Sequence, residues 1–370
     1  MLPPHGVGQS EVLAQQTSTA ASIESADRLP GRSVRILGPR DDRDPFGKHR
    51  HSTGVDAAGF RPFLVERVLF DRFAPMPELP EVEHLRRTLL PHLTGAVVGD
   101  AVLHRVDVLQ AVRPSSGTPP SLAPLQGAVV SEVRRRGKQL AVVTDRGTLG
   151  VQLGMSGALR ITAGETLLPP ETAHSEHVHA QFRVTTAGGA QVRLEFRDPR
   201  RFGGLWIAPT LESFIEARWR MLGPDALDLD DARFLERFTH RPRMLKALLL
   251  DQATIAGVGN IYADEALFAA RLHPARPAAG LSGDRLRELA RHLRDILNRA
   301  IENRGSSIRS YVDADGNAGD FALRHAVYGR AEQPCVVCGG VLRASQVAGR
   351  TTVHCPRCQA KPRRPARRGS

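Results

Sequence analysis

The sequence predicts an α+β protein of several domains: an N-terminal antiparallel β-sandwich with flanking helices, a helical domain, and a small cysteine-containing module. Three observations predict this class. Pairs of apolar segments that flank glycine-containing turns recur between residues 101 and 196. The apolar period becomes helical after Leu211, and all four cysteines lie between residues 335 and 358. The length of 370 residues allows two or three domains with substantial cores.

The first 75 residues differ from the rest of the chain. They are rich in Gly, Pro, Ser and Arg, show little periodicity, and carry ten basic residues against nine acidic ones. Such a segment buries too little apolar surface to fold alone. We interpret residues 1–75 as a disordered extension, a transit peptide, or upstream DNA translated from a wrongly assigned start codon. The acidic residues argue against the transit peptide.

An organised pattern begins at Met76. Pro80 suits the first turn of a helix, acidic residues favour the helix N-terminus, and Val82, Leu85 and Leu89 recur on one face. A short helix is therefore expected here, ended by Pro91.

Strand patterns follow this helix. The expected strands are 101–109, 140–144, 148–153, 180–186 and 190–196. Gly147 lies in the turn between the second and third of these, and Gly188 and Gly189 lie between the last two. Successive hairpins of this kind favour an antiparallel sandwich.

Helical patterns dominate after Leu211. The expected helices are 211–220, 231–238, 243–250, 260–270 and 283–303. The last of them carries an apolar stripe that we assign to the core; it consists of Leu286, Leu289, Leu293 and Leu297. A loop rich in Gly, Ser and Asp, residues 304–320, precedes the cysteines, and a basic tail, residues 361–370, ends the chain.

The charge of the chain favours a polyanionic partner. Its 51 Lys and Arg exceed its 39 Asp and Glu, which gives a formal net charge of +12. Nucleic acid is the leading candidate and an anionic membrane surface is the second. No apolar run approaches the roughly 18–20 residues that a membrane-spanning helix needs.

The four cysteines form two Cys-x-x-Cys pairs. Cys335 and Cys338 are separated by sixteen residues from Cys355 and Cys358. Each tight turn can offer two thiolates to one tetrahedral ion, so this spacing predicts one structural Zn²⁺ held by all four. The alternative, two disulfides, needs an oxidising compartment, and the N-terminus shows no secretory signal.

Six ordered motifs carry a resemblance to a known family. They are Met76-Pro-Glu-Leu-Pro-Glu-Val-Glu83, Gly154-Met-Ser-Gly157, Asp198-Pro-Arg-Arg-Phe-Gly203, Gly257-Val-Gly-Asn-Ile-Tyr-Ala263, Tyr328-Gly-Arg330 and the cysteine pairs. Together they resemble formamidopyrimidine-DNA glycosylase, the bacterial-type enzyme that repairs oxidised purines. The resemblance covers Met76 to about Gln359 and leaves out the extension and the tail.

The resemblance implies an order of domains. A catalytic β-sandwich domain is expected at 76–209, a helix-two-turns-helix DNA-binding domain at 210–327, and a zinc-finger hairpin at 328–360. The loop 304–320 is implied to recognise the lesion, with Gly305, Ser306 and Ser307 contacting the oxidised base. The chain is then expected to be a DNA glycosylase and abasic-site lyase that excises 8-oxoguanine and formamidopyrimidines from duplex DNA and nicks the strand by β,δ-elimination.

The resemblance also implies the catalytic residues. The amine of Pro77 is the nucleophile, and Glu78 is the general acid–base at the sugar. Lys138 contacts the phosphate beside the lesion and assists proton transfer, although a basic residue at a strand end is more often merely solvated. Glu81 is a supporting acid, or equally a residue that the helix N-terminus favours.

Pro77 can act only as the first residue of the chain. If translation starts at Met1, its nitrogen is a tertiary amide whose lone pair is delocalised into the carbonyl group. Either the functional chain begins at Met76, whose removal leaves Pro77 first, or the protein is an inactive relative. We favour the first interpretation because the other motifs are intact.

Residues that handle DNA are implied in two groups. Met155, Arg200 and Phe202 match the family's side chains that fill the space left by the everted nucleotide. Elsewhere a Met and a Phe in strand-flanking loops would more often be core residues.

The second group contacts phosphates. It consists of His177, Asn260, which can present N–H groups at a helix start, and Arg350, at the tip of a hairpin between the cysteine pairs. Helix capping is the ordinary reading of Asn260, and His177 could be merely exposed.

Two alternatives remain open at this stage. One is the sister branch resembling endonuclease VIII, which prefers oxidised pyrimidines; Leu79 favours the purine branch because the sister branch typically has glycine there. The other is a DNA-binding zinc protein without catalysis. We expect a monomer that binds damaged double-stranded DNA and no membrane, located in the bacterial cytoplasm with the nucleoid.

Overall fold

The computed structural model describes residues 76–112, 119–306 and 311–361. The predicted extension 1–75, Ser307 of the predicted recognition loop, and nearly all of the basic tail lie outside the described residues.

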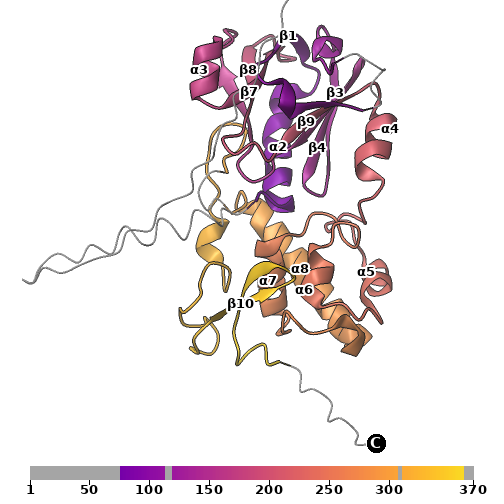
Figure 1. Ribbon diagram of the computed structural model, residues 1–370, viewed down its shortest axis with the longest axis vertical. Helices are drawn as coiled ribbons and strands as arrows, with labels where there is room; N and C mark the ends of the chain where they lie inside the picture. The colour runs from indigo at the N-terminus through magenta and orange to yellow at the C-terminus, as the bar shows by residue number, and fades with distance from the viewer. Residues whose placement is uncertain (1–75, 113–118, 307–310, 362–370) are drawn as a thin grey trace, which may run out of the picture. The chain divides into compact units, whose positions relative to one another are not determined.

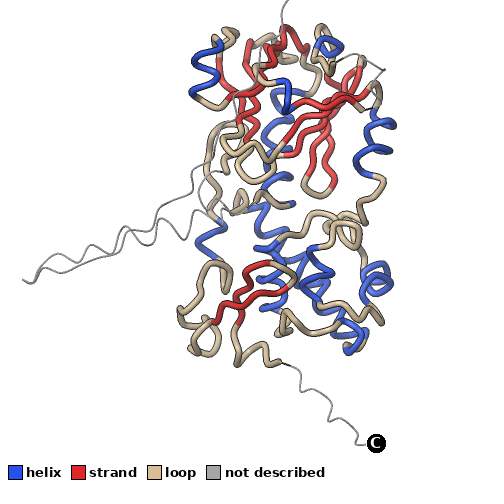
Figure 2. The backbone as a smooth tube through the Cα atoms, viewed as in Figure 1, coloured by secondary structure: helices blue, strands red, loops and turns tan. Residues whose placement is uncertain are grey.

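Two β-sheets form the first region (Figures 1 and 2). One has the order β1-β7-β8-β6, made of Val97–Leu103, Val178–Thr185, Gln191–Arg197 and Ala158–Ala163. The other has the order β2-β9-β5-β4-β3, made of Leu109–Ala111, Gly204–Ala208, Gly147–Gln152, Gln139–Thr144 and Val130–Arg136. Neighbouring strands are antiparallel except for β2 and β9. Apolar residues of both sheets share one core, so the predicted sandwich is confirmed.

The two predicted hairpins are confirmed as β4–β5 and β7–β8, with Thr144 opposite Gly147 and Thr185 opposite Gln191. The single strand expected over 101–109 is wrong. There β1 ends at Leu103, a 3₁₀ turn η2 follows at Val106–Val108, and β2 starts in the other sheet. Alternation of apolar residues does not reveal where a chain crosses from one sheet to the other.

Several short elements of this region were not predicted. Besides β3, β6 and β9 they are the 3₁₀ turn η3 at Ala123–Leu125 and the helix α3 at Pro170–Ser175.

Helix α2 extends over Leu79–Leu93. Its start follows from Pro80 in the first turn and from the Glu78 N–H, which donates to the Glu81 carboxylate at 2.9 Å. The prediction that Pro91 ends the helix is wrong. Proline removes only its own N–H bond, and the Thr94 N–H still donates to the carbonyl of Leu90 at 3.0 Å.

Helix α2 belongs to two cores. Leu79 packs in the core of the helical region, and its N–H donates to the carbonyl of Gly257 at 3.0 Å. One turn later, Val82 and Leu85 pack in the sandwich core. The residues just before α2 therefore lie where the two regions meet, as the course of α2 in Figure 1 shows.

The second region is helical, as predicted. α4 (Leu211–Phe214) and a π-helical turn (Ile215–Trp219) come first and pack on the second sheet, where Phe214 and Trp219 share a small core with Trp206. The helical region itself consists of α5 (Asp231–Phe238), α6 (Leu245–Leu250), α7 (Asn260–Ala269), η5 (Ala278–Gly280), α8 (Gly283–Glu302) and η6 (Phe321–Arg324). The leucine stripe of α8 is buried in this core, which confirms its assignment. No helix within 76–112, 119–306 or 311–361 is long and apolar enough to cross a membrane.

A two-stranded hairpin follows, with β10 at Arg343–Val347 and β11 at Arg350–His354 (Figure 2). Its turn is Ala348-Gly349, and both residues have positive φ, 53° and 71°. Arg350 is the first residue after this turn, as expected.

A buried ion-pair network joins the sandwich to the helical region. The Arg135 guanidinium bonds to the Glu83 carboxylate on α2 at 2.9 Å and to Asp225 at 2.6 Å. Asp225 also accepts the N–H of Gly137 at 2.8 Å. These guanidinium contacts and those from Arg86 lower the pKa of Glu83 to about 2, against the effect of its burial.

We expect Arg135→Met to lower the free energy of unfolding by about 3–5 kcal/mol, because two buried carboxylates lose their shared cation. Urea unfolding at pH 7 would measure this. Arg134→Met is the matched control, since Arg134 pairs with Glu132 on the exposed face of the same strand and should cost less than about 1 kcal/mol. Equal losses for the two variants would show that the buried network contributes nothing particular.

Candidate active site

The residues just before α2 meet the start of α7. Pro77 is buried, and the Glu78 side chain is only 2 % exposed. The Glu78 carboxylate accepts the N–H of Gly259 at 2.7 Å and that of Ile261 at 2.8 Å. The start of a helix offers unpaired N–H groups and partial positive charge, so a carboxylate is a favourable partner there.

This contact changes the interpretation of Asn260. We expected the first turn of α7 to present N–H groups to a phosphate, but three of its N–H groups, those of Gly259, Ile261 and Tyr262, point to Glu78. The internal carboxylate takes the place of an external anion. Asn260 instead donates its side-chain amide to the carbonyl of Thr351, on β11, at 3.0 Å.

Burial gives Glu78 an unusual affinity for a proton. Loss of solvation raises its pKa to about 7, and the nearby Glu81 also raises it. Lys138 and the N–H groups of α7 act in the opposite direction. A carboxyl group with a pKa close to neutral can both give and take a proton at physiological pH.

Lys138 faces the same point from the turn between β3 and β4. A Cβ atom added to Gly259 would lie 2.3 Å from the carboxyl carbon of Glu78 and 2.5 Å from the Lys138 amine. Glycine is therefore required at 259, because both functional groups approach its backbone. Burial lowers the pKa of Lys138 despite the two carboxylates close to it.

Glu81 lies at the centre of a buried network that the sequence did not predict. Its side chain accepts the hydroxyl of Tyr262, on α7, and the N–H of Ser306 at 2.7 Å. The Ser306 hydroxyl lies 3.1 Å from the Tyr262 hydroxyl and 2.9 Å from Nε2 of His325. The N–H and hydroxyl of Ser306 are thus engaged within the protein, so Ser306 is an anchor here and not the free base contact we expected.

The three residues expected to enter the duplex lie on two neighbouring loops. Phe202 is 54 % exposed and Arg200 is exposed, with its guanidinium carbon 4.9 Å from the centre of the Phe202 ring. Met155, on the loop 154–157, is half-buried. An exposed phenylalanine next to an arginine can stack on bases.

Asp198 joins these two loops, and sequence reasoning assigned it no role. Its buried carboxylate accepts the Ser156 hydroxyl at 2.5 Å and the N–H of Gly203 at 2.7 Å. The Ser156 oxygen in turn accepts the N–H of Arg200 at 3.0 Å. An aspartate before a proline in a loop that carries exposed Arg and Phe was the available signal, because buried carboxylates organise loop N–H groups. His177 is exposed beside these loops, and its carbonyl accepts the N–H of Asp198 at 3.1 Å.

The helical region holds the hairpin that carries Arg350. The buried amine of Lys246 lies 2.7 Å from the carboxylate of Asp264 and donates to the Thr352 hydroxyl at 2.6 Å. Asp264 accepts the N–H of Val353 at 3.1 Å. Arg350 itself is exposed, and its charge acts on Lys138, whose pKa it lowers.

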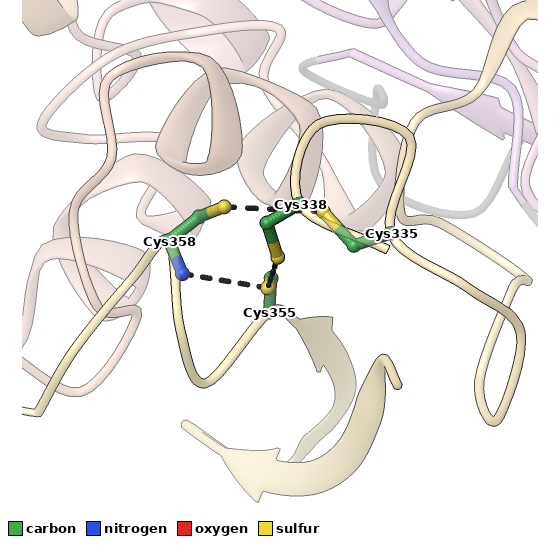
Figure 3. A group of neighbouring side chains, drawn as sticks. All are labelled: Cys335, Cys338, Cys355 and Cys358. Carbon is green, nitrogen blue, oxygen red and sulfur yellow. Dashed lines mark hydrogen bonds between the residues drawn. The ribbon is translucent and has the colours of Figure 1, made fainter. Parts of the chain in front are cut away.

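The four cysteine sulfurs converge between two tight turns (Figure 3). All four lie within 4.8 Å of one another, with 3.9 Å between Cys335 and Cys358 and 3.5 Å between Cys338 and Cys355. A tetrahedral zinc with Zn–S bonds of about 2.3 Å needs sulfurs roughly 3.8 Å apart, whereas a disulfide needs about 2.05 Å. The donor set fits zinc and excludes the two disulfides, which answers the alternative left open by the spacing.

Comparison with known proteins decides the family. Residues 76–205 match the formamidopyrimidine-DNA glycosylase N-terminal domain, 222–312 match the H2TH domain of the same enzymes, and 332–361 match a zinc finger found in FPG and IleRS. The chain belongs to the formamidopyrimidine-DNA glycosylase family.

Curated relatives of this family are similar over their full length. The formamidopyrimidine-DNA glycosylase of Gloeobacter violaceus is 42 % identical over 77 % of this chain and 98 % of its own. That of Methylococcus capsulatus is 40 % identical over 77 % of this chain and 100 % of its own.

Solved structures agree. The MutM (Fpg) protein of Thermus thermophilus is 38 % identical with a TM-score of 0.65, covering 78 % of this chain and 100 % of that one. The Lactococcus lactis Fpg in complex with DNA that contains an abasic site is 29 % identical with a TM-score of 0.66, covering 77 % and 100 %.

Several predictions from sequence are confirmed by this membership. They are the family, the three-part α+β fold, an enzyme of the DNA glycosylase and abasic-site lyase class, and one structural zinc on Cys335, Cys338, Cys355 and Cys358. The three matched ranges lie close to the expected domains, whose boundaries stay predictions, as do the roles of the other site residues.

Proposed function

We propose that the chain is a base-excision repair enzyme that everts oxidised purines, 8-oxoguanine and formamidopyrimidines, from duplex DNA, excises them, and nicks the abasic site. One observation carries this proposal: the residue after Pro77 is a buried glutamate with a pKa of about 7, held at the start of α7 beside the Lys138 amine. The family supplies the class of substrate, since a Lactococcus lactis relative has been solved with DNA that contains Fapy-dG.

The first chemical step is attack on the sugar. The neutral Pro77 amine forms a bond to C1′ of the damaged nucleotide, while the bond from C1′ to the base breaks and its electron pair leaves on the base. The nitrogen passes its proton to the departing base and then expels O4′, which takes a proton from Glu78. The product is an iminium ion between Pro77 and the opened sugar.

The iminium ion promotes strand cleavage. Its positive charge draws electrons from C2′ and lowers the pKa of Glu78, so the carboxylate formed in the previous step can remove the C2′ proton. Breaking of the C3′–O bond expels the 3′-phosphate, and a second proton loss expels the 5′-phosphate. Lys138, a cation beside the same carboxyl group, is placed to hold the phosphate next to the lesion.

The exposed loops suit a duplex from which one nucleotide has been turned out. Phe202 and Met155 would enter the stack, and Arg200 would pair with the base left opposite the gap. Asp198 would fix these loops through its contacts with Ser156 and Gly203. His177 and Arg350 would contact phosphates, and Asn260, which we predicted as a third phosphate contact, would act by holding the Arg350 hairpin.

The zinc would act through the hairpin alone. Four thiolates complete its coordination shell and leave no position for water or substrate. We expect Cys335→Ser to weaken duplex binding at least about tenfold, because Arg350 loses its fixed place among the phosphate contacts. Binding titration at constant salt measures this, with Val337→Ala, an exposed residue of the same turn, as control. Normal binding with failed excision would assign the zinc a chemical part and contradict this view.

A chain beginning at Pro77 tests the function. It would be incubated with duplexes carrying 8-oxoguanine opposite cytosine, an oxidised pyrimidine, or a preformed abasic site, with and without borohydride. We expect nicking and a covalent adduct that maps to Pro77, with the oxidised purine preferred. Preference for the pyrimidine would indicate the sister branch, and binding without adduct or nick would indicate a protein without catalysis.

The setting of the enzyme is also a proposal. We propose that it works as a monomer on damaged double-stranded DNA in the bacterial cytoplasm, with the nucleoid and not at a membrane. The net charge of +12 and the bacterial relatives support this. We propose the domain limits 76–209, 210–327, 328–360 and 361–370 given above, with 1–75 outside the catalytic body.

A further inference from the structure

One face of α2 carries a polar stripe. Glu81, His84, Thr88 and His92 follow one another at intervals of three and four residues, so they lie along one side of the helix. The neighbouring stripe, which contains Val82, Leu85 and Leu89, is buried in the sandwich core. Each residue of the polar stripe bonds to the segment 305–315, which follows α8 and is more than two hundred residues away in sequence.

Glu81, the first residue of the stripe, bonds to both Ser306 and Tyr311. Its carboxylate accepts the N–H of Ser306 at 2.7 Å, and its carbonyl accepts the Tyr311 hydroxyl at 2.7 Å. Gly305 has a φ of +77°, and a Cβ atom there would lie 2.7 Å from the Glu81 carboxylate. Only glycine lets the segment approach the helix so closely.

The next three residues of the stripe bond to residues 313–315. Nε2 of His84 donates to the Asp313 carboxylate at 3.3 Å, and the N–H of Ala314 donates to the Thr88 hydroxyl at 3.2 Å. Nε2 of His92 donates to the Asp315 carboxylate at 3.2 Å. The order of contacts along the helix follows the order of residues along the segment, so the two run side by side.

Asp313 makes the bound segment rigid. Its side chain is 3 % exposed and, besides His84, accepts the N–H groups of Asp315 at 3.1 Å and Asn317 at 2.8 Å. The carbonyl of Ala314 accepts the N–H of Ile161, on β6, at 2.8 Å. A movement of α2 relative to this segment would break several of these bonds together.

We propose that His84, Thr88 and His92 are positioning residues for recognition of the everted base. The polar stripe fixes the segment 305–306 and 311–320 against the helix that begins beside Pro77 and Glu78. This rests on the proposed function and on the prediction from the resemblance that the loop 304–320 recognises the lesion. Residues 307–310 lie outside the described residues, and the proposal uses only the contacts on either side of them.

A preformed abasic site distinguishes a role of the stripe in base recognition from a general structural role. An abasic site has no base to recognise, whereas the chemistry at its sugar needs Pro77 and Glu78. Loss of the histidine contacts should therefore slow excision of 8-oxoguanine and spare nicking of a preformed abasic site. A merely structural role would slow both reactions by the same factor.

The experiment uses chains beginning at Pro77 that carry His84→Ala, His92→Ala or both, in single-turnover assays on the two duplexes. One hydrogen bond to a carboxylate is worth roughly a fivefold change in rate, so we expect about fivefold slower excision for each variant and about 20-fold for the pair. Nicking of the abasic duplex should stay within about twofold. His84→Gln retains an N–H donor and should recover most of the loss.

The matched control is His292→Ala, which removes a histidine that faces Glu288 on its own helix, α8. It should change neither reaction. Equal slowing of both reactions by the stripe variants, or no slowing of either, would overturn the proposal.

Amide hydrogen exchange tests the stripe without any enzymatic activity, so failure of the stripe can be told apart from failure of the proposed function. If the unsubstituted protein neither excises nor nicks, the proposed function fails, and exchange still tests the stripe. We expect the N–H groups of Ala314, Asp315 and Asn317 to exchange at least about tenfold faster in the double variant, since their opening no longer breaks the histidine bonds. Unchanged exchange would overturn the stripe as an anchor whatever the activity.

Discussion

A chain whose first residue is Pro77 is expected to form a borohydride-trapped adduct with damaged DNA, and the same chain with Met76 retained is expected to form none. The reason is electronic. A free proline nitrogen is a secondary amine whose ordinary pKa of about 7.7–8.0 leaves a useful neutral fraction at pH 7.5. Acylation by a preceding residue delocalises the lone pair into the carbonyl group. We expect the loss to exceed about 1,000-fold, because the nucleophile itself is removed.

Three proteins make this comparison sharp: the chain beginning at Pro77, that chain with its N-terminus acetylated, and a chain in which Met76 is retained. Trapped adduct and nicked product would be measured on an abasic duplex, and duplex binding would be measured without borohydride as the control. Binding should be nearly equal in all three, since they differ only at the N-terminus and carry the same basic side chains. An adduct from the acetylated protein that maps to Lys138 would remove Pro77 from the mechanism.

Local features of the fold were predictable because they depend on neighbouring residues. The turn at Gly147 and the repeated alternation around it predict β4 and β5 whatever surrounds them. The cysteine pairs predict their own site for the same reason, since each turn places two sulfurs and the ion joins the turns.

Contacts between distant segments were not predictable in the same way. From sequence alone, Arg135 is an ordinary basic residue in a strand. Only the fold brings Glu83 and Asp225 into contact with it. From sequence, the start of α7 is expected to bind a phosphate. In the structure its N–H groups bind Glu78, which lies 181 residues earlier in the chain. In both cases the sequence shows a charged residue or a set of N–H groups that needs a partner. It does not show which distant residue the fold places there.

Helix α2 explains why the site has its particular form. Its first residue packs among the helices and its next turn packs in the sandwich, so Pro77 and Glu78 lie where both regions contribute groups. The buried junction removes water from Glu78, which raises its pKa, while α7 and Lys138 limit how far it rises. The packing that joins the domains is therefore also the cause of the glutamate's acid–base property.

Glu78→Gln is expected to slow excision by about 100- to 10,000-fold, the range that removal of a general acid–base typically costs. Glutamine keeps the shape, and its one carbonyl oxygen can still accept the N–H groups that reach one of the two Glu78 oxygens, those of Gly259 and Tyr262. It can neither protonate O4′ nor remove the C2′ proton. Duplex binding should change little, because the carboxyl group is buried and contacts α7.

The pH profile identifies the step that is lost. With a pKa of about 7, Glu78 is protonated below pH 7, and its acid form falls about tenfold for each pH unit above it. The Pro77 amine is neutral only above its own pKa, and the ordinary pKa of an α-amino group is about 7.7–8.0. Excision should therefore peak between the two values and decline on both sides.

In Glu78→Gln the alkaline decline should vanish while the acid decline stays. Glu216→Gln, at an exposed ion pair with Arg220, is the matched control and should keep both limbs. An alkaline limb that survives in Glu78→Gln would assign the proton to another group, and Lys138, whose pKa burial lowers beside the same carboxyl group, would be the residue to substitute next.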